Sequence, residues 1–340
     1  MGARPLFALA IVGMPINTLP QDTIRGILQG GERACADAGI VVAGGHSIDS
    51  VEPIYGLAAI GVLDPQRLKR NADARAGDVL VLGKPLGVGV YSSALKKEVL
   101  DADGYRQMIA STTRLNTVGM PLAALDGVHA MTDVTGFGLL GHLLEVCRAS
   151  GVAAEVDSAQ VPLLPQALEL LQRGCVTGAS HRNWTSYGTE VRFAEGLPAH
   201  WQPLLTDPQT SGGLLVSCAP EAVDAVLACF HDAGTFSSTA ALDVRLSTDF
   251  EPSVLASRLN SCSRKSRRRP TGSRCLSTRR ISTMWLPRRS SSSSTSSFCS
   301  HSTSSCSARP GSTGCGRSAR RAASLARWPS RMAGISMRTS

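Results

Sequence analysis

Apolar and polar positions in the first part of the chain predict strands and helices that follow one another in turn. Residues 6–14 form a continuous apolar run, which is typical of a strand buried on both faces. Residues 22–39 then place apolar side chains at helical spacing and end on a glycine. Two more strands are predicted, one over 40–50 that runs into a Gly-Gly turn and one over 54–63.

A charged connector rich in turn residues follows at 64–78 and predicts a domain boundary. Beyond it, 79–97 and 128–151 each predict a strand, a glycine-rich turn and a helix, in that order. Shorter predicted elements are a strand at 152–157, a helix at 163–174, and a strand and helix over 214–234. Because strands and helices alternate up to about residue 245, the predicted fold class is α/β to α+β with two units.

Charge is divided unevenly along the chain. The formal net charge is +9, but residues 261–340 hold 17 Lys and Arg and neither Asp nor Glu, so residues 1–260 carry 18 basic and 26 acidic side chains. The same 80 residues include 24 serines and few apolar positions, so they cannot bury enough surface to fold, and we expect disorder from 246 to 340. A basic arm that binds nucleic acid, a Ser/Arg-rich linker and a translated wrong reading frame all fit this composition, and we favour the last.

The five cysteines before the tail are scattered, with no Cys-x-x-Cys pair and no histidine cluster: Cys35, Cys147, Cys175, Cys218 and Cys229. They are expected as small core residues of a protein in a reducing compartment, which favours the cytoplasm. No run of eighteen apolar residues occurs, so no membrane span is predicted. The apolar opening lacks a plausible cleavage site and is expected to form a core strand rather than a signal peptide.

Residues 136–141 (GFGLLG) have the Gly-x-Gly-x-x-Gly spacing of dinucleotide-binding turns, between a predicted strand and helix. Asp157 lies 16 residues beyond the last glycine, so a nicotinamide-dependent oxidoreductase that uses Gly136–Gly141 is one hypothesis. Against it, Asp133 and Thr135 crowd the turn, and the preceding strand is short. His142 is expected on the surface of the following helix.

Two other glycine-rich segments have a structural and a functional interpretation. In residues 83–90 (GKPLGVGV) the lysine precedes the glycines, unlike in a P-loop, so a tight turn with an exposed lysine is expected. In residues 43–47 (AGGHS) two glycines allow a ligand to approach closely, and N–H groups there can receive phosphate oxygens, with His46 and Ser47 as further donors. A purely structural turn is the alternative.

Asp207 is the one acidic residue of LLTDPQTSGGLLVS (204–217). It is expected at the end of a buried strand, with Thr210 and Ser211 available for capping and Gly212-Gly213 keeping the approach to it open. One carboxylate in such a place suits a ligand of Mg²⁺, which takes one or two carboxylates together with phosphate oxygens and water. An aspartate that caps the following turn is the alternative.

Six segments taken together resemble the selenophosphate synthetase (selenide, water dikinase) family, in order and spacing, from residue 2 to about 245. They are GMPINTLP (13–20), AGGHSIDSVEPIYGLA (43–58), KPLGVGV (84–90), AMTDVTGFGLLGHL (130–143), RNWTSYG (182–188) and TDPQTSGGLL (206–215). Six blocks in order are far more specific than any one glycine motif.

The resemblance implies a two-domain aminoimidazole ribonucleotide synthetase-like architecture, whose N-terminal ATP-binding domain pairs with its copy in a homodimer. It implies a cytoplasmic enzyme that, with Mg²⁺, converts ATP, selenide and water into selenophosphate, AMP and orthophosphate. Gly45, His46 and Ser47 match a segment that contacts ATP in the neighbouring subunit's site. Asp207 matches a Mg²⁺-binding aspartate.

Relative to that family, we expect a preceding segment to be missing, which carries the catalytic Cys or selenocysteine, a nearby Lys and further aspartates. No catalytic residue is therefore assigned within this chain, and we predict that it makes no selenophosphate by itself. The expected parts are the remainder of the ATP-binding and dimerisation domain at 1–65, a connector at 66–78, an α+β domain at 79–245 and an unrelated tail at 246–340. An incomplete first domain would have unpaired sheet edges and be marginally stable. Nucleic-acid binding through the tail remains an alternative, and no membrane partner is expected.

Overall fold

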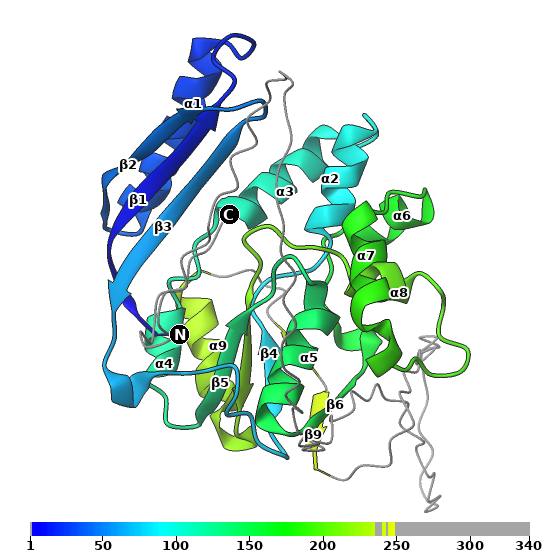
Figure 1. The fold of residues 1–340 in the computed structure, drawn as a ribbon. Coiled ribbons are helices and arrows are strands. Elements are labelled where there is room, and N and C mark those ends of the chain that lie inside the picture. The colour runs from blue at the N-terminus through cyan, green and yellow to red at the C-terminus, as the bar shows by residue number, and fades with distance from the viewer. Residues whose placement is uncertain (1, 235–239, 243, 249–340) are drawn as a thin grey trace, which may run out of the picture. The chain divides into compact units, whose positions relative to one another are not determined.

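The computed structural model describes residues 2–234, 240–242 and 244–248. Its first part is a three-stranded sheet with one helix: β1 (Arg4–Met14), α1 (Gln21–Asp37), β2 (Val41–Asp49) and β3 (Ile54–Val62). The strand order is β2-β1-β3, with β2 parallel and β3 antiparallel to β1. α1 connects the parallel pair and lies along one side of the sheet (Figure 1). The strands predicted at 6–14 and 54–63 and the helix predicted at 22–39 are confirmed.

One face of this sheet packs against α1. Because side chains alternate along a strand, Ala8 and Met14 share a face of β1, and both are buried. Tyr55 of β3 pairs with Val12 on the same face, and it occupies the space beside Gly31, where a Cβ would lie 1.8 Å from the Tyr55 hydroxyl. The glycine in α1 therefore lets the helix approach the sheet closely.

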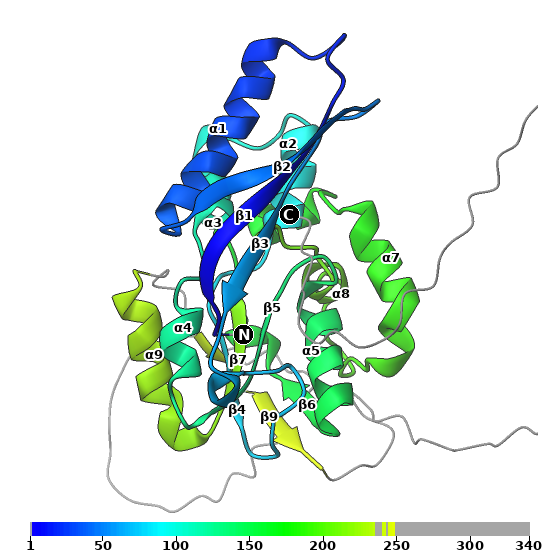
Figure 2. The same ribbon diagram turned by 60° about the vertical axis from the view of Figure 1, so that its left-hand side comes forward.

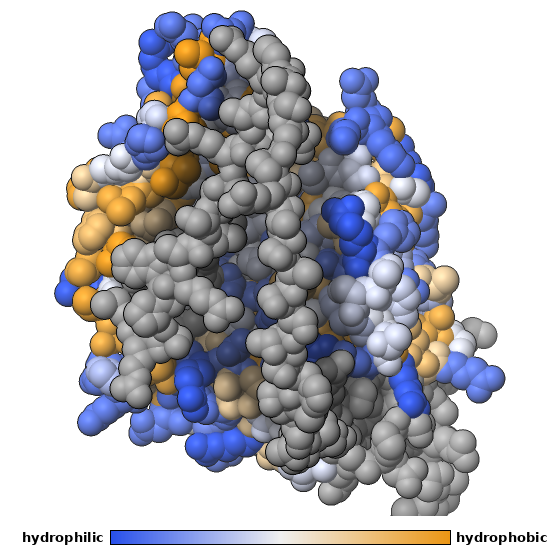
Figure 3. Space-filling view, viewed as in Figure 1, coloured by the Kyte–Doolittle hydropathy of each residue, from blue (hydrophilic) through white to orange (hydrophobic). Residues whose placement is uncertain are grey.

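The opposite face of the sheet is apolar and exposed. The strand register places five large apolar side chains there, each more than one third exposed: Leu9, Ile11, Val41, Ile48 and Ile54. These five residues are called the open face below. Figure 3 shows apolar surface gathered where this sheet lies. A contiguous apolar patch on a folded domain is typical of a surface that another chain covers.

The Gly-Gly turn expected within 40–50 is wrong, because β2 continues through Gly44 and Gly45 as a strand. A bulge in the pairing between β1 and β2 accommodates this segment. Gly45 has φ +152°, and a Cβ there would lie 1.9 Å from the carbonyl oxygen of Ala10. Glycine is needed at this position so that two backbones can meet, and not to reverse the chain.

A 3-10 turn, η1 (Pro65–Arg67), follows, and the second part begins at β4. Its elements are β4 (Val79–Leu82), α2 (Val88–Lys96), α3 (Ala102–Thr113), α4 (Gly119–Ala123), β5 (Val128–Asp133), α5 (Gly138–Ser150), β6 (Ala153–Val156), η2 (Ser158–Gln160), α6 (Ala167–Gln172), α7 (Gly178–Tyr187), η3 (Gly188–Glu190), α8 (Trp201–Leu205), β7 (Leu214–Cys218), η4 (Pro220–Ala222), α9 (Val223–Asp232), β8 (Ala240–Leu242) and β9 (Val244–Ser247). Four strands form a sheet of order β5-β7-β4-β8 with antiparallel neighbours, and β6 pairs with β9.

Helices cover both faces of the four-stranded sheet. Leu80 and Leu82 of β4 enter one hydrophobic core with residues of α2, α5, α6, α7 and α8. Val81, which points the other way, enters a second core with residues of α4 and α9. Figure 2 shows α4 and α9 on one side of β5, β7 and β4, and α5, α7 and α8 on the other. The strands predicted around 79–82, 128–133, 152–157 and 214–218 are confirmed.

Three expectations differ from this part of the structure. The strand expected to end at Asp207 is wrong, since residues 201–205 form α8 and Asp207 follows a helix. The helices α3, α4 and α7 were not predicted. β9 extends past the boundary expected at 245 as far as Ser247, and Leu246 within it is buried. The expectation of a disordered tail concerns residues that, from 249 onward, lie outside the described part of the chain.

Candidate functional site

Two connections meet where β4 ends and its neighbour β7 begins. One leads from β4 into α2 and contains residues 83–87, and the other leads from α8 into β7 and is called the 206–213 loop below. Two side chains of this loop, Asp207 and Gln209, are buried and point at the first turn of α2. The structure therefore brings together two of the six segments that were singled out in the sequence.

Asp207 is 1% exposed, and its Oδ2 accepts hydrogen bonds from the N–H groups of Gly89 (2.9 Å) and Val90 (3.2 Å). These belong to the N-terminal turn of α2, whose N–H groups lack partners within the helix and favour negative charge. A Cβ at Gly89 would lie 2.4 Å from Oδ1 of Asp207, so the carboxylate reaches this place because the second residue of the helix is glycine. Asp207 thus caps a distant helix, and not the turn that follows it.

Gln209 completes the cap. Its Nε2 donates to the carbonyl oxygen (2.9 Å) and to Oδ2 (3.0 Å) of Asp207, and its Oε1 accepts from the N–H groups of Gly87 and Val88, both at 3.2 Å. Four consecutive N–H groups, from 87 to 90, are therefore bound by two side chains of the 206–213 loop. The Gln209 amide therefore binds both the backbone and the side chain of Asp207.

The electrostatics of Asp207 depend on burial. Loss of solvent raises the pKa of this carboxyl to about 7, although the hydrogen bonds from Val90, Gln209 and Gly89 act in the opposite direction. Its second oxygen, Oδ1, is buried and has no hydrogen-bond partner among the described residues. A polar atom in that situation is costly unless something binds it.

Lys84 is not the exposed turn residue that was expected: it is 1% exposed. Its Nζ donates to the carbonyl oxygens of Ser111 (3.1 Å), Arg114 (2.6 Å) and Ser211 (2.6 Å). Burial, and next the positive charge of Arg114, lower the pKa of Lys84 to about 8. Lys84 follows the last residue of β4 by two positions, and the pattern of the sequence could not show that it is buried.

The glycine pair of the 206–213 loop was expected to leave an open approach, and this is wrong. Gly212 and Gly213 are buried, and a Cβ would lie 1.8 Å from the carbonyl oxygen of Val134 at the first and 2.3 Å from the N of Lys84 at the second. The loop is held further by a hydrogen bond from Asn116 Nδ2 to the carbonyl oxygen of Gly212 (2.8 Å). The glycines allow close packing of backbone on backbone.

The glycines at 136–141 also serve packing. Gly138 has φ +70°, and a Cβ there would lie 2.7 Å from the backbone carbon of Thr206. β5, which precedes them, is antiparallel to its neighbour β7, so the parallel β-α-β unit of a dinucleotide-binding fold is not formed here. His142 is buried, contrary to expectation, and its Nε2 lies 3.1 Å from the Thr135 hydroxyl.

Gly45, His46 and Ser47 lie in β2, and the structure does not gather them with Asp207. His46 pairs with Ile11 and so shares the open face, whereas Ser47 pairs with Val12 on the side of α1. His46 is exposed. Within the part of the chain that the structure describes, the hydrogen bonds to the Asp207 side chain come from residues 89, 90 and 209.

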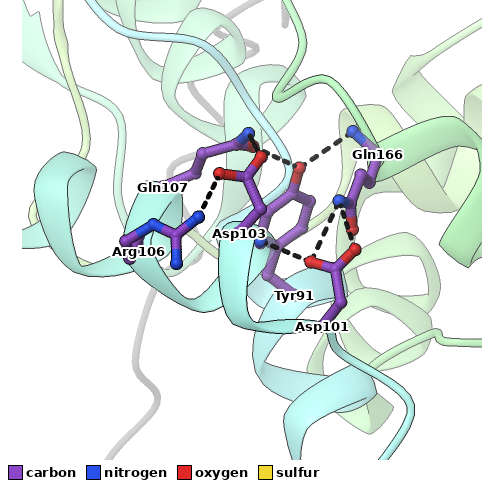
Figure 4. Close-up of polar contacts among 7 residues, drawn as sticks. Tyr91, Asp101, Asp103, Arg106, Gln107 and Gln166 are labelled. Carbon is purple, nitrogen blue, oxygen red and sulfur yellow. Dashed lines mark hydrogen bonds and ion pairs between the residues drawn. The ribbon is translucent and has the colours of Figure 1, made fainter.

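A second polar network fixes α2 against its neighbours (Figure 4). The hydroxyl of Tyr91, which is fully buried, donates to Gln107 Oε1 of α3 (3.0 Å) and accepts from the N–H of Gln166 just before α6 (2.8 Å). Gln166 also donates to Asp101, and Asp101 caps α3 through the N–H of Gly104 (2.7 Å). α2 therefore presents its first turn to Asp207 from a fixed position.

Metal ligands are sparse among these residues. No group of three or more His, Cys, Asp and Glu side chains that could hold a metal ion occurs among the described residues. None of the helices within the described ranges is long and apolar enough to cross a membrane. Among the described residues Asp207 thus belongs to no such group, and a cation at its carboxylate would need ligands from a bound substrate or from other residues.

Known proteins resemble the chain over the parts just described. Residues 1–63 match the family described as AIR synthase related protein, N-terminal domain, and residues 75–239 match its C-terminal domain. A selenide, water dikinase from Dechloromonas aromatica is 63% identical over 234 residues, which are 69% of this chain and 67% of the relative. The chain belongs to the selenide, water dikinase family. A relative of the same name from Burkholderia pseudomallei is 68% identical over 234 residues, or 69% of this chain.

The chain spans 66% of the length of the Burkholderia selenide, water dikinase. Solved structures agree on the fold. Thiamine-monophosphate kinase from Stenotrophomonas maltophilia has a TM-score of 0.55 at 19% identity, covering 73% of this chain and 71% of that chain. The hydrogenase maturation protein HypE in complex with ATP has a TM-score of 0.51 at 17% identity, covering 72% and 66%. The expected family and two-domain fold are confirmed, and the oxidoreductase alternative is not supported.

Lys84, Gln209 and Asn116 are the residues of this site that the sequence interpretation missed. Lys84 and Gln209 lie within the blocks that carry the family resemblance, as KPLGVGV and TDPQTSGGLL. Membership of these blocks was the available signal for both, because no local pattern around either residue shows its hydrogen-bond partners.

Proposed function

We propose that this chain carries the ATP-binding and Mg²⁺-binding framework of a selenide, water dikinase. The overall reaction converts ATP, selenide and water into selenophosphate, AMP and orthophosphate. The observation that carries the proposal is the buried carboxylate of Asp207, hydrogen-bonded to the first turn of α2, in a chain that is 68% identical over 234 residues to a protein named for this activity.

The residues present fit a magnesium ion. Asp207 keeps one buried oxygen, Oδ1, without a hydrogen-bond partner among the described residues, while Oδ2 is held by two N–H groups and the Gln209 amide. One oriented carboxylate is what Mg²⁺ takes from a protein when phosphate oxygens and water complete its shell. Bound there, the ion would neutralise charge on the phosphates of ATP, since phosphoryl transfer depends on positioning and charge compensation. Gln209 would hold the carboxylate in place.

ATP is the proposed nucleotide because of the family and because HypE, a structural neighbour, was solved in complex with ATP. Gly45, His46 and Ser47 are proposed to contact ATP in the site of a second copy. The exposed place of His46 on the open face supports this, because a partner that covers the open face would meet that side chain.

A homodimer is proposed on the same observation. The five apolar side chains of the open face are more than one third exposed in the single chain, and β2 and β3 are the edges of their sheet. The domains are proposed as 1–65 for ATP binding and dimerisation, 66–78 as connector, and 79–247 as the α+β domain, with the last boundary moved to the end of β9. A cytoplasmic location is proposed, consistent with the buried thiols of Cys35, Cys147, Cys175 and Cys218.

ATP binding to the full chain, measured by calorimetry with and without Mg²⁺, tests the proposal. We expect binding that strengthens when Mg²⁺ is added, and Asp207→Asn should remove that gain because the amide is a poor ligand for a hard cation. Asp232→Asn, an exposed position at the end of α9, is the matched control and should behave as wild type. Mg²⁺-dependent binding that survives Asp207→Asn would refute the role given to Asp207.

Turnover is tested separately. Phosphorus NMR of a mixture of the full chain, ATP, Mg²⁺ and selenide detects selenophosphate, and AMP release is compared with and without selenide. Formation of selenophosphate supports the proposed family function.

A further inference from the structure

Lys84 binds two backbone segments that are far apart in the sequence, the end of α3 and the 206–213 loop. The residue is 1% exposed, and its ammonium group donates to the carbonyl oxygens of residues 111, 114 and 211, at 2.6 to 3.1 Å. All three N–H donors of the group are therefore used inside the protein, and Lys84 has none left for a ligand. Lys84 must therefore act through the backbone segments that it binds.

Two of the three carbonyls belong to the C-terminal end of α3. Ser111 lies in the last turn and Arg114 is the C-cap residue. Carbonyl groups there lack partners within the helix and carry the negative end of its dipole, so a cation is favourable. α3 is itself fixed to α2 by the bond between Tyr91 and Gln107. Lys84 thus binds a rigid element on one side.

The third carbonyl belongs to the 206–213 loop. Ser211 has φ +49°, a conformation that costs free energy for a residue with a side chain and persists only where the surroundings impose it. Its carbonyl oxygen is one of the two shortest acceptors of Lys84, at 2.6 Å, and Ser211 Oγ lies 3.5 Å away. The same loop carries Asp207 four residues earlier, with its side chain against α2.

Burial of an ammonium group without a carboxylate among its hydrogen-bond partners is expensive, so a purely apolar side chain would serve stability equally well or better. A buried charge retained in such a place is explained if it selects one arrangement of the loop. Asn116, three residues beyond α3, makes a parallel tie to the same loop through the carbonyl oxygen of Gly212 (2.8 Å).

We propose that Lys84 is a positioning residue for the cation site at Asp207. It fixes the 206–213 loop to the end of α3, so that the Asp207 carboxylate meets the first turn of α2 with Oδ2 hydrogen-bonded and with Oδ1 having no hydrogen-bond partner among the described residues. The inference rests on the proposed function, because it concerns the metal site assigned there. Asn116 assists in the same role.

The test is Mn²⁺ binding to the full chain, with Mn²⁺ as a paramagnetic probe followed by electron spin resonance and by calorimetry. Lys84→Met keeps the length and apolar character of the stem and removes the ammonium group. It should weaken Mn²⁺ binding about 10- to 100-fold, the range found when a residue that orients a metal ligand is lost. Lys97→Met is the matched control, because Lys97 also donates to a backbone carbonyl, that of Gly174 at 2.8 Å, but at the other end of α2. It should leave the affinity unchanged.

The outcomes separate this inference from the proposed function. Wild-type affinity in Lys84→Met overturns the inference, even if its urea midpoint has moved, since a merely structural lysine would change stability and not affinity. Unchanged affinity in Asp207→Asn overturns the proposed metal site itself, and the inference with it. Should Lys84→Met fail to fold, Asn116→Ala decides: a weakening of roughly fivefold or more supports the positioning role, and wild-type affinity overturns it.

Discussion

β2 and β7 show how differently the two parts of this chain bury their strands. All nine residues of β2 are exposed, whereas all five residues of β7 are buried. β7 lies between β5 and β4, with a hydrophobic core on each face, while β2 is an edge strand whose apolar neighbours form the open face. The second part therefore completes its own core, and the first part has apolar surface that a partner is needed to cover. The proposed site residues divide in the same way. Asp207 is buried in the second part, and His46 is exposed on the open face of the first part.

The largest expected effect is on the pH dependence of the second part. The pKa of Asp207 is raised to about 7 in the folded chain from the model-compound value of 3.8. The folded state then binds the proton more tightly, so the stabilisation is complete below pH 4 and is lost as pH rises through 7. The change is on the order of 4 kcal/mol, at about 1.4 kcal/mol for each pKa unit. Urea unfolding of wild type and Asp207→Asn at pH 4 and pH 7.5 should show that wild type loses about 4 kcal/mol more stability than the variant between the two pH values.

Lys84 contributes with the opposite sign at higher pH. Its pKa is lowered to about 8 from 10.5, so the cost of burying the charge is complete below pH 8 and is relieved between pH 8 and 10.5. Wild type should become more stable relative to Lys84→Met over that interval.

The prediction for Asp207 is contradicted if the stabilities of Asp207→Asn and wild type change in parallel between pH 4 and 7.5. Asp207 would then be solvated in the folded chain, and its environment would not differ from that of the exposed sheet.

The next largest effect concerns backbone packing. Gly212→Ala should destabilise the second part by about 3 kcal/mol, because the new Cβ would lie 1.8 Å from the carbonyl oxygen of Val134 and neither backbone can yield easily. Gly30→Ala in α1 is the matched control, since nothing lies within 4 Å of its Cβ position. There alanine should stabilise α1 by about 0.5 to 1 kcal/mol. Thermal unfolding measures both, and equal effects would mean that the loop is not packed as described.

A substitution on the open face is expected to have the smallest effect on the stability of the folded chain, but it should weaken self-association. Ile11→Asp should weaken self-association at least about 100-fold, near 2.7 kcal/mol, because an unpaired carboxylate would be buried in the dimer. The second part should unfold as in wild type, since Ile11 is 47% exposed within the chain. Ile109→Asp, on an exposed position of α3, is the control. Sedimentation equilibrium measures the association. A wild-type chain that is a monomer at micromolar concentration would contradict the proposed homodimer.

Much of the fold followed from local pattern. Continuous apolar runs gave β1, β3, β4 and β7 correctly, because a buried strand needs apolar side chains on both faces. The pattern failed at 203–207, where a short apolar run forms the end of α8, since four or five apolar residues fit a buried helix turn as well as a strand. It also failed at Gly44-Gly45, where glycine serves a bulge within β2.

The candidate site was foreseen only in part. Asp207 was singled out because a lone carboxylate near glycines is unusual. In the structure it is buried and accepts a hydrogen bond from the first turn of α2. Lys84 was expected in solvent, because neither its neighbours nor its spacing show that carbonyls from residues 111, 114 and 211 would converge on it. Gln209 has no local signal for the four hydrogen bonds that it makes with residues 87, 88 and 207.

The amino-acid sequence alone determined the family, the strands β1, β3, β4, β5, β6 and β7, the helices α1, α2, α5, α6 and α9, and the residues on which cation and nucleotide binding should be tested. These depend on short-range spacing and on blocks of residues, which a linear chain displays directly. Only the tertiary structure decided that Asp207 caps α2 and that Lys84 is buried. Only it placed His46 and Ser47 on opposite faces of a strand. Those facts depend on groups more than a hundred residues apart, brought together by the burial of two hydrophobic cores, and on a strand register that local sequence does not specify.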